Sequence, residues 1–472
     1  VLPVTWVNGE LATQIVERLP HYVLARTAGG IGEGLLVDAL ADPAFGLALV
    51  EAIGRRRRIA GDAGTVLAQP TRAFRRLVDP STPLPEPALS RAEQSNNSLI
   101  YGDRLILKLF RRVEPGLNPD LEIGRFLTEK VRFEHIPPVA GSLEYQSGQG
   151  EPMTLGILQG YVVNEGDAWQ YTLDTLGGYI ERVLASQIDP PEVSLATPDL
   201  LACAAQEPPP EAYELIDTYI ESAHLLGRRT AELHVALASE RQDPAFAPES
   251  FSPHYQQSVR QSMRSFAAQT LQTLRKQLAR LPDPVRADAE RVLAREASIY
   301  ETYRGLSQRQ IHAKRIRCHG DYHLGQVLYT GRDFVIIDFE GEPARPLSER
   351  RLKRSPVLDV AGMLRSFHYA AYAALFDHLQ RGLVQNPAQV EPWLRYWYAW
   401  VASRFLQGYL GVIGSAGVLP SDPEDLRLLL DAYLLDKAIY EIGYELGHRP
   451  DWLAIPLRGV LELLPEPQQV RV

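Results

Sequence analysis

Cysteine is scarce in this chain: its 472 residues include only Cys203 and Cys318. The two lie far apart, so a framework of disulfide bonds is not expected. Long hydrophobic runs are missing as well. No apolar stretch approaches the ~18 residues that a membrane-spanning helix requires, and no signal peptide is visible at the N-terminus. We therefore expect a cytoplasmic protein without a membrane partner.

An excess of positive charge is also lacking. The chain has 49 Lys and Arg residues against 58 Asp and Glu residues, which gives a net charge of −9. This balance provides no general affinity for polyanions, so nucleic acid is not an expected partner. The chain does have a content of 45% hydrophobic residues, which supports the cores of two or three domains.

Two short polar segments are the most informative feature of the sequence. In the first, Asp321 lies in a Cys-His-Gly-Asp-Tyr-His loop and is followed five positions later by Gln326. In the second, Asp338 follows residues 333–337, whose β-branched and aromatic side chains predict a strand. A loop aspartate, an amide and a strand-end aspartate in this order are typical of a kinase that uses metal-bound ATP.

The pattern gives each polar group a role. Asp321 would act as the catalytic base that accepts the proton of the attacking hydroxyl. Gln326 and Asp338 would hold Mg²⁺ against the phosphates of ATP, because hard divalent cations prefer oxygen ligands. A single loop aspartate is far more often a turn or capping residue, so the prediction depends on all three groups together. His323 is a candidate substrate contact, although a packed histidine with satisfied ring nitrogens explains it too.

A small nucleotide-binding lobe is expected before this pattern. Residues 98–110 predict two strands joined by a tight Gly-Asp turn, with Lys108 on the second strand. Asn118 and Pro119 suit the cap and the first position of the next helix, which places Glu122 near the start of that helix. In kinases a strand lysine contacts the phosphates and pairs with a helix glutamate, so we predict that Lys108 pairs with Glu122.

No Gly-rich G-x-G-x-x-G loop precedes Lys108. In its place is a turn of short polar residues whose backbone amides could meet phosphate oxygens, and an ordinary Asn/Ser turn is an equal alternative. Residues 155–163 predict a strand whose backbone could hydrogen-bond adenine, or a plain sheet strand. These two segments supply the other candidate ATP contacts, which are Ser95, Asn96, Asn97, Ser98, Gln159 and Val162.

Together these features predict an α+β, bilobal protein-kinase-like fold. A Pro-rich linker separates an N-terminal unit, residues 1–88, from the small nucleotide-binding lobe, residues 89–163. Residues 164–472 have mostly helical periodicity, and we expect them to form the C-lobe with the catalytic loop and a substrate pocket. Residues 55–58 are four consecutive arginines, which invite a phosphate-binding interpretation; a solvated helix end, favoured by the helix dipole, is the more frequent explanation.

Longer segments around these motifs carry a family resemblance. They are residues 93–98, 105–112, 118–129, 319–326, 338–343, 349–366 and 436–441. Together they resemble the bacterial maltokinases, relatives of the aminoglycoside phosphotransferases, over most of the chain from about Leu89. By this resemblance the N-terminal unit is a cap subdomain that precedes the kinase lobes.

The resemblance implies ATP-dependent phosphorylation of maltose at its anomeric hydroxyl. The product would be maltose 1-phosphate, used for glycogen and α-glucan biosynthesis. The chain begins at Val1, and maltokinases are sometimes fused behind a trehalose synthase, so a covalent or physical link to that enzyme is also expected. A kinase of glucosamine, another small sugar or an aminoglycoside remains an alternative, and so does a non-catalytic pseudokinase.

The sugar pocket is expected near the C-terminus of the chain. Residues 436–452 mix aromatic with charged side chains, as a pocket needs for stacking on sugar faces and for bonding hydroxyls. We take Lys437, Tyr444 and Trp452 as candidate substrate contacts. Core packing explains the tyrosine nearly as well.

Overall fold

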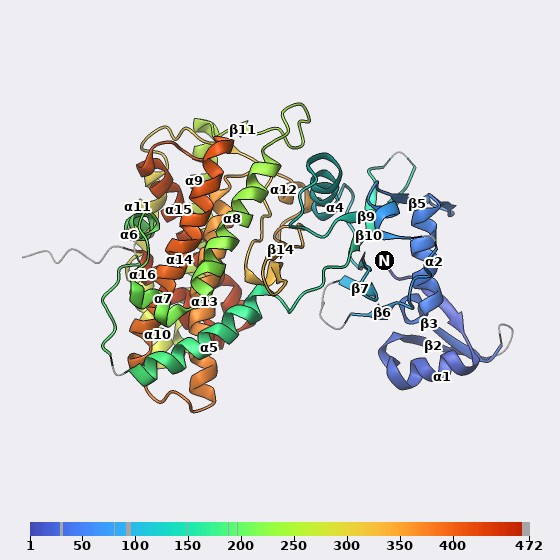
Figure 1. The fold of residues 1–472 in the computed structure, drawn as a ribbon, viewed down its shortest axis with the longest axis horizontal. Helices are drawn as coiled ribbons and strands as arrows, with labels where there is room; N and C mark the ends of the chain where they lie inside the picture. Colours follow the sequence, from blue (N-terminus) through green and yellow to red (C-terminus); the bar gives the residue numbers. More distant parts are fainter. Residues whose placement is uncertain are drawn as a thin grey trace, which may run out of the picture. The chain divides into compact units, whose positions relative to one another are not determined.

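The structure is a computed structural model that describes residues 1–28, 32–79, 81–90, 96–148, 150–186, 188–195 and 197–464. The chain divides into two compact units (Figure 1). Unit 1 consists of residues 1–163 and 335–351, and unit 2 consists of residues 164–334 and 352–472.

Unit 1 contains a seven-stranded antiparallel sheet with the strand order β4-β5-β9-β10-β8-β7-β6 (Figure 1). Its strands are β4 (Arg58–Ala60), β5 (Thr65–Pro70), β6 (Ala88–Leu89), β7 (Asn96–Tyr101), β8 (Leu105–Phe110), β9 (Val139–Gln146) and β10 (Met153–Gly160). The hairpin predicted at residues 98–110 is confirmed, since β7 pairs with β8 from Asn96 and Phe110 to the turn. Gly102 occupies the left-handed region there with φ of 59°, which glycine adopts without a steric penalty.

The N-terminal residues form a second, three-stranded sheet and part of the first. The smaller sheet has the order β1-β3-β2. β5 pairs with β9 from Thr65 opposite Gln146 to Pro70 opposite Gly141, so the large sheet continues across the predicted boundary at residue 88. The elements of this region are β1 (Val4–Val7), α1 (Gly9–Arg18), β2 (Val23–Thr27), β3 (Gly34–Asp38), α2 (Pro43–Gly54) and α3 (Phe74–Leu77).

The core of unit 1 lies between the large sheet and α2. Ile53 of α2 and Leu107 of β8 are fully buried in one hydrophobic cluster. Three further elements position the candidate site residues. They are α4 (Pro119–Arg125), which continues as a π-helix (Phe126–Val131), the short helix α12 (Leu347–Arg350), and β14 (Phe334–Ile336), along which the chain returns from unit 2.

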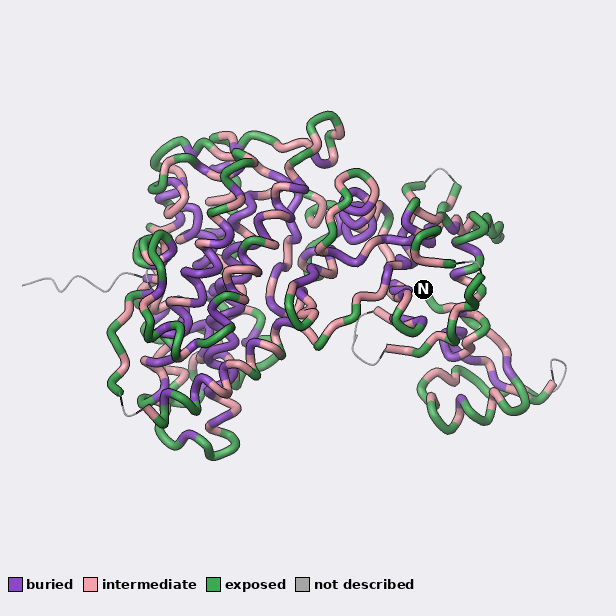
Figure 2. The backbone as a smooth tube through the Cα atoms, viewed as in Figure 1, coloured by how far each residue is buried: buried purple, intermediate pink, exposed green. Residues whose placement is uncertain are grey.

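Unit 2 is mainly helical, and its buried residues follow the central helices (Figure 2). Its helices are α5 (Ala168–Ser186), α6 (Thr197–Ala204), α7 (Pro210–Ile216), α8 (Tyr219–Leu237), α9 (Pro253–Gln277), α10 (Asp283–Ala294), α11 (Glu296–Gly305), α13 (Val357–Gln380), α14 (Glu391–Ile413), α15 (Pro423–His448) and α16 (Ala454–Leu463). Three short strands accompany them: β11 (Glu249–Ser250), β12 (Lys314–Arg315) and β13 (Val327–Tyr329).

Two glycines let α8 and α14 pack backbone against backbone. A Cβ atom on Gly227 would lie 2.0 Å from the carbonyl oxygen of Phe405, and one on Gly408 would lie 2.1 Å from that of His224. No side chain fits at either position unless the helices move apart. Among the described residues, no helix is long and apolar enough to span a membrane.

Candidate functional site

Asp338 lies just beyond the end of β14 in unit 1, where the sequence predicts a metal-binding aspartate. Its φ is 64°, in the left-handed region that residues other than glycine rarely adopt. Such a conformation costs free energy and persists only where the surrounding structure imposes it. Its side chain is 33% exposed, so the carboxylate is accessible to solvent.

Lys108 of β8 is the centre of a charged cluster in unit 1. Its ammonium nitrogen Nζ lies 2.5 Å from Oδ1 of Asp338, 2.6 Å from Oε1 of Glu340 and 3.5 Å from Oδ2 of Asp120. The lysine side chain is only 10% exposed. Burial lowers the pKa of Lys108, but the three carboxylates outweigh burial and raise its pKa well above the ordinary value.

Asp120 is the most deeply buried carboxylate of this cluster. Burial is the main cause that raises its pKa to about 6; Lys108 opposes this rise, while the negative charges of Asp338 and Glu340 contribute to it. Oδ1 of Asp120 also accepts a hydrogen bond from the backbone N–H of Phe339, at 3.1 Å. The carboxylate therefore contacts both the lysine and the backbone next to Asp338.

The predicted pairing of Lys108 with Glu122 is not the one in the structure. Glu122 accepts two hydrogen bonds from the guanidinium group of Arg351, at 2.8 and 3.1 Å, while Asp120 lies beside Lys108. The predicted helix start is confirmed, because α4 begins at Pro119 and Asn118 caps it by accepting from the N–H of Asp120. Successive helical residues are turned by about 100°, so Asp120 and Glu122 point in nearly opposite directions and only one of them can face β8.

Asn96 and Asn97, which the sequence predicts in a polar turn, are the first two residues of β7, and their side chains have different partners. Asn96 donates a hydrogen bond from Nδ2 to Oε1 of Glu340 at 2.9 Å, which joins it to the lysine cluster. Asn97 instead donates to the hydroxyl of Tyr22 at 3.1 Å and accepts from Arg111, so its side chain is engaged toward the N-terminal residues.

The other candidate ATP contacts remain predictions. Ser98 is buried and pairs with Lys108 across the ladder of β7 and β8. Gln159 lies on β10 opposite Ile106, and Val162 follows the end of that strand. Ser95 lies outside the described residues.

The carboxylates around Lys108 fit a divalent cation by their chemistry. Ligand oxygens of Asp120, Asp338 and Glu340 all lie within 4.8 Å of one another. Hard cations such as Mg²⁺ prefer oxygen donors of this kind. Gln326, the other predicted metal ligand, belongs to unit 2 and is half-buried at the end of a short 3₁₀ helix, Leu324–Gln326.

In unit 2, Asp359 of α13 is hydrogen-bonded to the backbone of the loop that carries Asp321. The buried carboxylate of Asp359 accepts hydrogen bonds from the backbone N–H groups of His319, at 2.8 Å, and Gly320, at 2.9 Å. It also lies 3.0 Å from Nε2 of His234. Burial would raise the pKa of Asp359, but His234 and the other hydrogen-bond donors lower it below the ordinary value.

His323, a predicted substrate contact, has a structural role. Its Nδ1 accepts a hydrogen bond from the N–H of Gly325 at 3.1 Å and thereby caps the 3₁₀ helix that ends at Gln326. This bond uses the neutral tautomer that carries its proton on Nε2. A role of His323 in substrate binding remains a prediction.

A row of aromatic and cationic side chains, here called the aromatic row, extends from Asp321 within unit 2. Lys437 of α15 places Nζ 3.5 Å from Oδ1 of Asp321 and 4.7 Å from the ring centre of Tyr440. The rings of Tyr440 and Tyr444 stack with their centroids 6.4 Å apart. The row therefore starts at the predicted catalytic base and continues along the surface of α15.

Arg449 and Trp452 complete the aromatic row. The guanidinium carbon of Arg449 lies 5.6 Å from the ring centre of Tyr444 and 5.0 Å from that of Trp452. Trp452 stacks on Tyr369 of α13 with centroids 5.9 Å apart. The structure thus brings the predicted pocket residues Lys437, Tyr444 and Trp452 into one continuous row. Tyr369 also belongs to the row, although it lies 68 positions before Lys437 in the chain. No local sequence pattern indicates that Tyr369 contacts this segment.

Two proteins named glucosamine kinase are similar to this chain in sequence. The one from Streptacidiphilus jiangxiensis is 25% identical over 380 residues, which cover 79% of this chain and 72% of that protein. The one from Mycolicibacterium smegmatis is 27% identical over 383 residues, which cover 79% of this chain and 78% of that protein. No protein-family model matches the chain.

A solved structure of glucosamine kinase in complex with glucosamine, ADP and inorganic phosphate is similar in fold. It matches with a TM-score of 0.64 at 21% sequence identity and covers 93% of this chain and 87% of that one. A second crystal structure of glucosamine kinase gives the same TM-score of 0.64. The chain therefore has the kinase-like, mixed α and β fold of these enzymes.

Proposed function

We propose that this chain is a sugar kinase that transfers a phosphoryl group from ATP. The observation that carries the proposal is the cluster at Lys108, where a buried strand lysine contacts Asp338 immediately beyond a strand end. Phosphoryl transfer depends mainly on positioning and on electrostatic stabilisation, which this combination supplies. The two similar proteins named glucosamine kinase support the class of reaction.

The nucleotide half of the proposed mechanism uses residues of unit 1. Lys108 neutralises negative charge on the phosphates, and Asp338 would hold Mg²⁺ with Asp120 or Glu340 nearby and Gln326 as a further predicted ligand. Bound Mg²⁺ supplies charge stabilisation to the phosphoryl oxygens. Asn96 fixes the carboxylate of Glu340, so the orientation of this carboxylate is set before any ligand binds.

The acceptor half uses residues of unit 2. Asp321 accepts the proton of the sugar hydroxyl as that oxygen attacks. The ammonium group of Lys437 faces the same carboxylate and orients it. Asp359 fixes the loop backbone just before Asp321 through two hydrogen bonds, so the base has little freedom to move away.

For the acceptor we propose maltose, phosphorylated at its anomeric hydroxyl. Lys437 and Tyr444 are seven residues apart on one helix, which corresponds to about 10 Å along its axis. With Trp452 beyond them, the aromatic row is longer than one sugar ring and suits two linked rings. Aromatic faces stack on the apolar faces of sugars, while cationic groups bond their hydroxyls.

Glucosamine is the second candidate acceptor, because it is what the names of the similar enzymes indicate. The cations of the aromatic row are each paired with a carboxylate. Lys437 lies 3.5 Å from Asp321, and Arg449 donates to Glu445 at 2.8 Å, so the charges of the row are balanced and suit a neutral sugar.

A coupled assay of ADP release tests the proposal. Maltose, glucose, glucosamine, trehalose and kanamycin are offered in turn with MgATP, and we expect turnover with maltose. Turnover with glucosamine alone would replace the acceptor and leave the mechanism in place. ADP release with none of the five would contradict the proposal that the chain is a sugar kinase.

A further inference from the structure

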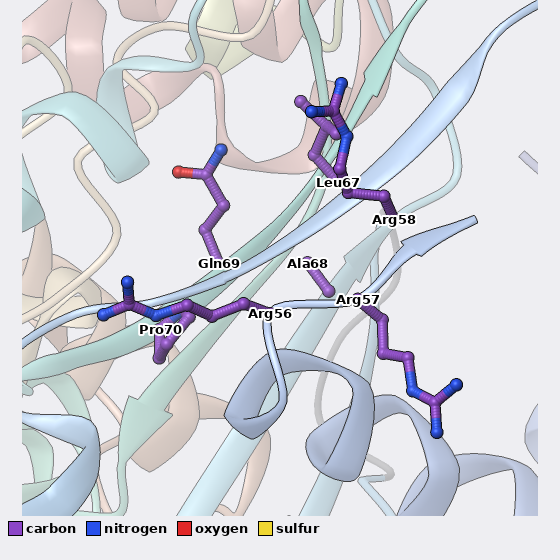
Figure 3. Close-up of a pocket in the computed structure, with 7 residues that line it drawn as sticks. All are labelled: Arg56, Arg57, Arg58, Leu67, Ala68, Gln69 and Pro70. Atoms are coloured by element: carbon purple, nitrogen blue, oxygen red, sulfur yellow. The ribbon is translucent and has the colours of Figure 1, made fainter. Parts of the chain in front are cut away.

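A pocket in unit 1 lies apart from the lysine cluster, at the β4 edge of the large sheet (Figure 3). We call it the arginine pocket; it has a volume of about 350 Å³. The strands β5, β9 and β10 separate β4 from β8, so this edge is about 19 Å from the strand of Lys108 at the usual spacing of 4.8 Å. The residues that line the pocket are Arg56, Arg57, Arg58, Leu67, Ala68, Gln69 and Pro70.

No described residue pairs with the side chains of the three arginines of the pocket. Within the described part of the chain, none of their guanidinium groups forms an ion pair or a side-chain hydrogen bond. Arg55, the neighbour that lies outside the pocket, pairs with Glu51 at 2.8 Å. No carboxylate lines the pocket. The cavity therefore has an unbalanced positive charge.

The three arginines line the pocket from one short segment between the end of α2 and the start of β4. Arg58 pairs with Leu67 in the ladder of β4 and β5, and side chains alternate between the two faces of a strand. In Figure 3, Arg58 and Arg57 accordingly point in opposite directions, and the side chain of Arg56 extends toward Pro70. Arg56 reaches this position through a left-handed backbone with φ of 53°.

This backbone conformation is unfavourable for an arginine. After the end of a helix the left-handed position is usually occupied by glycine, which adopts it at lower cost. Arg56 instead places a long cationic side chain there, and its guanidinium group lies beside Pro70 in Figure 3. Residues held in rare backbone conformations concentrate at binding sites.

From these observations we infer that the arginine pocket binds a small organic phosphate, such as a sugar phosphate. Guanidinium groups bind phosphate oxygens through paired hydrogen bonds, and the amide of Gln69 adds a donor. Leu67 and Pro70 offer apolar surface to the carbon part of the ligand. A volume of about 350 Å³ lies in the range of small-molecule sites and exceeds what inorganic phosphate requires.

The first test is arginine footprinting on the unmodified protein. Phenylglyoxal modification is read by mass spectrometry with and without glucose 1-phosphate. We expect the ligand to protect Arg56 and Arg58, and to leave Arg26 unprotected, an exposed arginine of β2 with no ion pair among the described residues. Equal modification of Arg56 and Arg58 with and without ligand would overturn the inference. This test needs no variant, so it does not depend on the folding of altered proteins.

The second test is calorimetric titration with glucose 1-phosphate. Loss of paired, charge-assisted hydrogen bonds should weaken binding about tenfold or more in Arg56→Ala/Arg58→Ala, and Arg26→Ala should bind as the wild type does. Full affinity in Arg56→Ala/Arg58→Ala would overturn the inference.

A titration with inorganic phosphate distinguishes a site for an organic phosphate from a site for the phosphate ion alone. We expect it to bind more weakly than glucose 1-phosphate, because it cannot use Leu67 and Pro70. Equal affinities would show that the pocket recognises phosphate alone and would refute an organic ligand. If Arg56→Ala/Arg58→Ala does not fold, Arg56→Lys/Arg58→Lys keeps the charge while losing the paired geometry, and it should still bind more weakly than the wild type.

Discussion

Replacement of Lys108 by methionine tests the electrostatic account of unit 1. The substitution keeps the length of the side chain but removes a cation that is 10% exposed and lies within 3.5 Å of three carboxylates. Removing one partner of a buried ion pair costs about 3–5 kcal/mol, because the opposite charges remain buried. We expect a loss of stability of this size in Lys108→Met at pH 8.

The pH dependence of that loss follows from Asp120. Its pKa is about 6 in the folded protein, against 3.8 for an ordinary aspartate. A raised pKa contributes stability that is fully present below pH 3.8 and is lost as the pH rises through about 6, and two units correspond to about 3 kcal/mol. Lys108 lowers this pKa, so its removal moves the titration of Asp120 to higher pH. The destabilisation by Lys108→Met should therefore be large at pH 8 and smaller at pH 5.

Hydrogen exchange of peptides from β8 and β10 measures the loss of stability around Lys108 locally. This is preferable to a single unfolding curve, because the chain has two units that need not unfold together. Lys353→Met is the matched control. Lys353 is equally buried, but its carboxylate partner Glu249 is 46% exposed and has a lowered pKa, so no comparable change is expected between pH 5 and 8. Unchanged protection in Lys108→Met at pH 8, or a loss that grows on acidification, would refute the reasoning.

Three further predictions concern unit 2. Asp321→Asn should lower kcat by several orders of magnitude with little effect on MgATP binding, measured by ADP release and by titration; full turnover would exclude this residue as the base. Asp359→Asn should cost about 1.5–3 kcal/mol at pH 7, measured by hydrogen exchange of peptides from the loop at residues 319–326. Because the pKa of Asp359 is lowered, its contribution is present above pH 3.8 and fades as the pH falls, so wild type and variant should converge in acid. Gly408→Ala, whose Cβ would lie 2.1 Å from the carbonyl oxygen of His224, should cost about 1–3 kcal/mol, whereas Gly411→Ala on the same helix meets nothing within 4 Å and should be neutral or stabilising.

Local sequence patterns were sufficient to predict the strands and the helix that carry the candidate site residues of unit 1. The Gly-Asp turn predicted the hairpin of β7 and β8, and Asn118 with Pro119 predicted the start of α4. These features depend on the backbone preferences of a few neighbouring residues, so they can be recognised without knowledge of the fold. The position of Asp338 after a strand follows in the same way from an apolar run.

Contacts between distant segments could not be predicted in the same way. Asp120 and Glu122 both suit the first turn of a helix, and only the position of β8 decides which of them contacts Lys108. The pairing of β5 with β9 joins residues about 75 positions apart, which the linker at residues 80–87 had suggested were separate. Tyr369 entered the aromatic row from α13 for the same reason.

The segment at residues 335–351 shows how the strained geometry of Asp338 is maintained. This segment follows some 170 residues of unit 2, yet it belongs to unit 1, where its charges oppose those of the segment from β8 to α4. Asp338 contacts Lys108, while Arg351 makes two hydrogen bonds to Glu122, so the segment is fixed near both of its ends. A third ion pair, between Arg350 and Glu114 at 3.0 Å, lies beside the second. Because all of these partners lie within one compact unit, the left-handed conformation of Asp338 is imposed by unit 1 itself. The carboxylate that we propose as a metal ligand is therefore preorganised before nucleotide or sugar is bound, and this is the property that a kinase mechanism based on positioning requires.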